Sequence, residues 1–187
     1  MAETISPVVH GGRNRSYWKA VAAHMVGAVL ASALLGALLG SMGSVLDLGS
    51  STGSLTLVAI LAAAYAVGEL TGFKLPLPHR RGQVPEWWRN YFAPTTTAFL
   101  YGAGLGVGFA THVRSGLLLI VAVIAFLGGS PVLGALLLVP FGIARAASAL
   151  IGFKFAERFG ASSMTRLVGS GALLAVSAVA GSFALSV

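Results

Sequence analysis

The segment VAAHMVGAVLASALLGALLGSM, residues 21–42, decides the class of fold. It carries no Lys, Arg, Asp or Glu, and a helix of about 20 apolar residues spans the roughly 30 Å hydrocarbon core of a bilayer. The whole chain shares this character, because 9% of its 187 residues are charged, against about 25% in a typical soluble domain. The sequence therefore predicts an all-α integral membrane protein surrounded by the lipid bilayer.

Small residues recur at every fourth position of this segment, as Ser32, Gly36 and Gly40. In a membrane, a stripe of small residues lets a second helix approach closely. We therefore expect a helix contact along this stripe. We also expect the segment to be retained in the protein, because it is longer than the apolar region of about 7–15 residues found in a signal peptide. His24, near Lys19, is expected at the membrane interface.

Further apolar segments follow along the chain. Residues 55–72 predict a second span, and residues 131–153 and 167–187 predict the last two spans. Residues 94–127 are too long for one straight span, since a helix of that length would extend about 51 Å. They predict either one discontinuous span, broken within a Gly-rich stretch, or two short spans joined by a loop.

The basic residues distinguish between these two topologies. With one discontinuous span the chain has five spans, and residues 1–19, 73–93 and 154–166 place ten Lys and Arg on one face and none on the other. With two short spans the chain has six, and the basic residues divide seven against four. The positive-inside rule favours five spans. We therefore expect a cytoplasmic tail over residues 1–16 and one transmembrane domain over residues 17–187, multi-pass in the plasma (inner) membrane.

Several classes of chemistry are excluded or disfavoured by composition. The chain contains no cysteine, which excludes disulfides, thiolate metal sites and thiol–disulfide exchange. Its four histidines show no spacing typical of a metal site, so we expect neither a metal nor a cofactor. The net charge of +7 is attributed to membrane topology, and no nucleic-acid partner is expected. We find no enzyme signature and expect no enzymatic activity.

Residues 99–111, FLYGAGLGVGFAT, resemble the broken helix that opens the second half of the cytochrome c biogenesis transmembrane (CcdA/DsbD) family. Residues 130–138 and 141–145 look like that family's next helix, and residues 75–81 resemble the basic loop between its halves. The resemblance implies a related membrane fold. That family carries electrons through a cysteine pair, so its redox activity cannot apply to this cysteine-free chain unless a partner or cofactor supplies the redox groups.

The discontinuous span contains the candidate binding site. A cation at the bilayer centre costs at least about 2.5–3.5 kcal/mol on insertion scales, so Arg114 would have to face a cavity or a partner. An interrupted helix also leaves backbone N–H groups that bind anions. The predicted substrate-binding residues are Gly104, Gly106, Gly108, Thr111, His112 and Arg114. In the alternative topology Arg114 lies at the water interface or pairs with a carboxylate of a partner chain.

Two functions follow from this reading. The first is a transporter of a small, possibly anionic solute, working through the discontinuous helix. The alternative is a non-catalytic accessory or structural subunit of a larger membrane complex. A homo-oligomer or other membrane subunits are the expected partners, because five spans enclose little volume. Glu69 and Arg145 both lie toward the cytoplasmic face and are predicted to form a structural ion pair.

Overall fold

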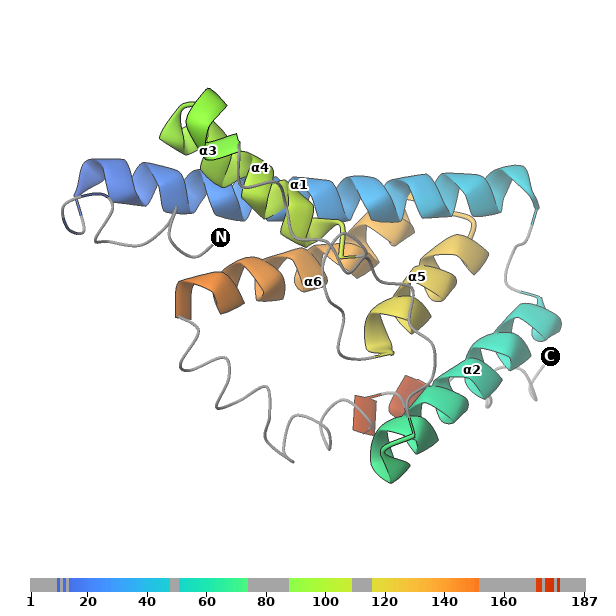
Figure 1. Ribbon diagram of the computed structural model, residues 1–187. Coiled ribbons are helices and arrows are strands. Elements are labelled where there is room, and N and C mark those ends of the chain that lie inside the picture. Colours follow the sequence, from blue (N-terminus) through green and yellow to red (C-terminus); the bar gives the residue numbers. More distant parts are fainter. Residues whose placement is uncertain are drawn as a thin grey trace.

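In the computed structural model of the chain, the described residues are 10, 12, 14–47, 51–73, 88–108, 116–151, 171, 172, 174–176 and 178. Over these residues the backbone forms helices and turns and contains no strand (Figure 1). The prediction of an all-α fold is confirmed for this part of the chain. The placed helices are α1 (Arg15–Val45), α2 (Thr52–Thr71), α3 (Trp88–Tyr91), α4 (Pro94–Gly106), α5 (Leu117–Leu127) and α6 (Pro131–Ile151).

The ends of α1 and α2 follow from local capping. Asn14 caps α1, because its side-chain oxygen accepts a hydrogen bond from the Tyr17 N–H at 3.0 Å. This cap starts α1 several residues before the predicted span. Ser51 caps α2 in the same way through the Ser54 N–H at 3.2 Å. Gly72 ends α2 with φ +77°, a left-handed conformation that favours glycine.

Two of the described helices, α1 and α2, are long and apolar enough to cross a membrane. α5 and residues 131–147 of α6 are apolar but shorter. The helices themselves therefore support association with a membrane, and they do not establish the predicted five-span bundle.

α1 is the central helix, and α4, α5 and α6 all pack against it (Figure 1). A methyl group added to Gly36 would collide with the carbonyl oxygen of Gly134 in α6, and one added to Gly40 would collide with the carbonyl oxygen of Ser130. The small-residue stripe is thus a backbone-to-backbone helix contact, as predicted. The buried residues of α1 are Tyr17, Ala20, Val21, His24, Gly27, Ala28, Ser32, Gly36, Gly40 and Gly43.

The outer face of α1 has the opposite composition. Large aliphatic side chains recur there at four-residue steps, and each is between 49% and 64% exposed. A water-soluble bundle buries such side chains, whereas a contiguous exposed apolar face indicates a membrane or partner contact. Small residues inside and large ones outside are expected of a helix whose outer face meets lipid. The residues of this face are Val26, Leu30, Leu34, Leu38 and Met42.

α4 and α5 lie one after the other beside α1 and together extend along most of its length. α4 runs in the same direction as α1, because Gly102 packs against His24 and Gly106 packs against Ala28. α5 begins beside the end of α4, where Leu118 contacts Gly108. It ends near the C-terminal end of α1, where the Phe126 carbonyl meets Gly43. α6 then runs antiparallel to α1, because Gly36 packs against Gly134 whereas Gly40, further along α1, packs against the earlier residue Ser130.

Candidate functional site

The structure describes half of the predicted substrate-binding residues. Thr111, His112 and Arg114 lie outside the described residues, so their role stays a prediction. Gly104 and Gly106 lie within α4, and Gly108 follows its end.

The described glycines serve the packing and turning of the chain. A methyl group on Gly106 would collide with the carbonyl oxygen of Ala28, so this position lets α4 approach α1. Gly108 has φ +69°, in the left-handed region that favours glycine. The side chains of Leu118 and Phe141 pack against Gly108. The predicted interruption therefore begins at Gly108, where both the backbone conformation and the close packing favour glycine.

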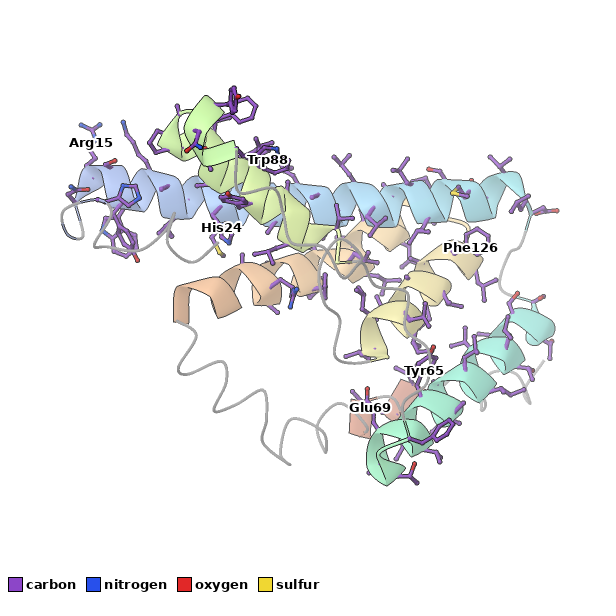
Figure 2. All side chains as sticks on the ribbon, viewed as in Figure 1. Arg15, His24, Tyr65, Glu69, Trp88 and Phe126 are labelled. Carbon is purple, nitrogen blue, oxygen red and sulfur yellow. The ribbon has the colours of Figure 1, made fainter. Side chains whose placement is uncertain are left out.

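The most distinctive polar contact between apolar helices joins α2 to the start of α5. Glu69 Oε1 accepts a hydrogen bond from the backbone N–H of Gly116 at 3.0 Å. Gly116 immediately precedes α5, and the first N–H groups of a helix have no partner within it and lie at the positive end of its dipole. A carboxylate is therefore well suited to this position. Figure 2 shows Glu69 and Tyr65 on the part of α2 nearest the start of α5.

Tyr65 and an apolar stripe complete this contact. A methyl group on Gly116 would collide with the Tyr65 ring, so the glycine lets the two helices meet closely. Val58, Ala62 and Ala66 of α2 are buried together with Ile120 of α5. Glu69 thus forms the polar end of a contact that is otherwise apolar. A hydrogen bond to a charged group of this kind contributes about 1.5–3 kcal/mol to stability.

This arrangement bears directly on the predicted anion site. That prediction relied on unpaired N–H groups where the long apolar segment is interrupted. At Gly116, the chain's own carboxylate takes the N–H, so an external anion would meet a negative charge at this position. Arg145, half-buried in α6, was predicted as the partner of Glu69. That ion pair stays a prediction.

His24 is a polar residue whose surroundings the sequence did not reveal. It is 2% exposed and faces α4, and its expected depth at the membrane interface stays a prediction. Its Nδ1 lies 3.2 Å from the carbonyl oxygen of Ala98 in α4, which assigns the ring proton to Nδ1. Within the described part of the chain, Nε2 is buried and has no hydrogen-bond partner. The sequence feature that could have predicted this burial is the position of His24 on the same helical face as the small residues Ala20 and Ala28.

Comparison with known proteins gives a consistent set of relatives. No family model and no solved structure matches the chain. The chain is similar to a protein named methylamine utilization protein MauF from Paracoccus versutus, with 33% identity over 144 residues, 75% of this chain and 53% of that protein. A protein of the same name from Methylophilus methylotrophus is 32% identical over 70% of this chain and 46% of that protein. Another, from Paracoccus denitrificans, is 32% identical over 58% of this chain and 40% of that protein. The chain spans about half the length of these curated relatives.

These similarities correct two predictions made from the sequence. The resemblance to the CcdA/DsbD family is wrong, because the relatives that match most of the chain are MauF proteins. The misleading residues were glycines and aliphatic side chains, which any closely packed membrane helices share. Gly102, for example, packs against the His24 backbone. The prediction of a solute transporter is also wrong, since the relatives are named for methylamine utilization, which agrees better with the accessory alternative.

Proposed function

We propose that the chain is a MauF-like membrane accessory protein that acts in methylamine utilization without catalytic chemistry of its own. The observation that carries this proposal is the 33% identity to a MauF protein over 75% of the chain. The structure supports an accessory role, because two polar side chains that lie between helices hold neighbouring helices together. Glu69 joins α2 to α5, and His24 joins α1 to α4.

The proposal includes a multi-pass topology with the N-terminus in the cytoplasm. α1 and α2 have the length and apolarity of spans, and α4 followed by α5 runs once along α1. We infer that residues 94–127 form one discontinuous crossing and that α6 crosses back. The turn before α6 supports this, because Gly129 lies against Ser44 near the C-terminal end of α1.

Single cysteines test this topology directly, because the natural chain has none. We expect Ser51→Cys and Ser130→Cys to react with a membrane-impermeant thiol reagent added to intact cells. Asn90→Cys, in α3, should react only after the cells are permeabilised. Labelling of Asn90→Cys in intact cells would contradict the cytoplasmic placement of α3. Protection of Ser130→Cys until permeabilisation would contradict one discontinuous crossing.

Growth on methylamine tests the accessory function. In the source organism, deletion of the gene is expected to abolish or strongly slow growth with methylamine as the sole nitrogen source, with growth on ammonium unchanged. The wild-type chain should restore growth, as should Leu34→Ala, which changes an exposed side chain. Gly36→Leu should fail, because it disrupts the α1–α6 contact. Normal growth of the deletion strain on methylamine would refute the proposal.

A further inference from the structure

Exposed aromatic and basic side chains gather at one end of the described bundle. In α1, Trp18 is 56% exposed, and Arg15 and Lys19 beside it are also exposed. At the end of α3, Tyr91 is 77% exposed and the following Phe92 is 42% exposed. We refer to these five residues as the collar.

Two contacts hold α3 at this end of the molecule. The Trp88 ring stacks on Tyr101 of α4, with ring centroids 6.0 Å apart and an interplanar angle of 29°. The Thr97 hydroxyl lies 3.4 Å from the carbonyl oxygen of Trp88 and 3.3 Å from that of Phe92, within reach to donate to either. Since α4 packs against the N-terminal half of α1, α3 lies beside that half (Figure 1). The two parts of the collar therefore belong to the same end of the bundle.

The other end of α1 differs in charge. Residues 43–53 contain Asp47 and no Lys or Arg. Figure 2 shows Arg15 at one end of α1 and Phe126 of α5 near the other. The apolar outer face of α1 begins at Val26, about 12 Å along the helix from Trp18. The collar thus lies just beyond the apolar face, at the end that carries the positive charge.

We propose that the collar binds anionic phospholipid headgroups of the cytoplasmic leaflet. Indole and phenol rings prefer the headgroup depth of a bilayer, where one edge is apolar and the other is hydrated. Arg15 and Lys19 supply positive charge beside these rings, which complements the negative surface potential of that leaflet. The inference rests on the membrane placement in the proposed function, and it adds a preferred lipid class and the residues that select it.

Lipid retention by the purified full-length chain tests the proposal. The protein in detergent is incubated with equal amounts of phosphatidylglycerol and phosphatidylcholine, and the bound lipids are measured by native mass spectrometry. We expect a preference for phosphatidylglycerol. Arg15→Gln with Lys19→Gln should reduce that preference about 25-fold, or about fivefold for each cation removed. The matched control, Arg15→Lys with Lys19→Arg, keeps both charges and should retain the preference.

Three results would overturn the lipid assignment. One is equal retention of the two lipids by the wild-type chain, and another is an unchanged preference in the doubly neutralised variant. The third is displacement of phosphatidylglycerol by millimolar inorganic phosphate, which would assign a phosphate site rather than a lipid surface. Removal of the wild-type chain from vesicles by an alkaline carbonate wash would instead overturn the membrane placement, so the two failures are distinguishable.

Discussion

Gly36→Leu is expected to lower the free energy of unfolding by at least about 3 kcal/mol, the upper end of the usual cost of overpacking a core. The added side chain has no space, because even a methyl group at Gly36 would collide with the Gly134 carbonyl oxygen. Gly134 meets the carbonyl oxygen of Gly36 in the same way, so the two backbones approach each other at paired glycines. Relief would require α6 to move away from α1.

Thermal unfolding of the purified protein in detergent, followed by circular dichroism, measures this effect. Leu34→Ala is the matched control, because Leu34 is 64% exposed on the outer face of the same helix. It should change the free energy of unfolding by no more than about 0.5 kcal/mol, as is usual for a surface substitution. Gly36→Ala should lie between the two. Equal unfolding temperatures for Gly36→Leu and Leu34→Ala would show that the α1–α6 contact is not the close one described.

The small-residue contact along α1 could be predicted from the sequence, because it depends only on the spacing of residues within one helix. Ser32, Gly36 and Gly40 share one face of any helix that contains them, whatever that face meets. The length of the segment 94–127 likewise predicted an interruption of the helix, because the segment is longer than one straight span. Its glycines are concentrated in one stretch, which indicated where the interruption lies. Helical periodicity and length limits therefore predicted the all-α class and the central small-residue contact.

The partners of individual polar residues could not be predicted in the same way. The sequence placed Glu69 near the cytoplasmic end of a span, and Arg145 was the nearest plausible partner by depth. Depth does not say which helix lies beside α2, so it did not predict the contact of Glu69 with the start of α5. The ion pair with Arg145 stays a prediction. His24 was predicted near the membrane interface because Lys19 lies nearby, and depth again does not reveal that its side chain contacts α4.

The similarity to MauF proteins changes how these polar residues between helices are interpreted. In a transporter, a carboxylate and an interrupted helix would be read as a substrate site. In an accessory protein they need only fix how the helices assemble, and the two readings make different predictions for the same residue. Glu69 allows this distinction, because its contact with Gly116 is defined and it lies close to the interruption.

Glu69→Leu is expected to lower the free energy of unfolding by about 1.5–3 kcal/mol, because it removes a charged acceptor from the Gly116 N–H. Glu69→Gln keeps an acceptor oxygen without the charge, so its loss should be smaller, about 1 kcal/mol. Hydrogen exchange should localise the effect, with faster exchange of the first amides of α5 in Glu69→Leu than in the wild type. Thr71→Val is the control on the same helix, since the described hydrogen bonds of the Thr71 hydroxyl are to carbonyls of α2 itself, the shortest to Val67 at 2.8 Å.

The growth assay separates the two readings of Glu69. If Glu69 positions α5, Glu69→Gln should still restore growth on methylamine, and Glu69→Leu should lose activity in proportion to its loss of folded protein in the membrane. If Glu69 instead holds a substrate, Glu69→Gln would abolish growth while unfolding and exchange at α5 stay close to the wild type. The neutral variant decides between them, because glutamine preserves the acceptor that a helix start needs and removes the charge that binding a cationic substrate would need.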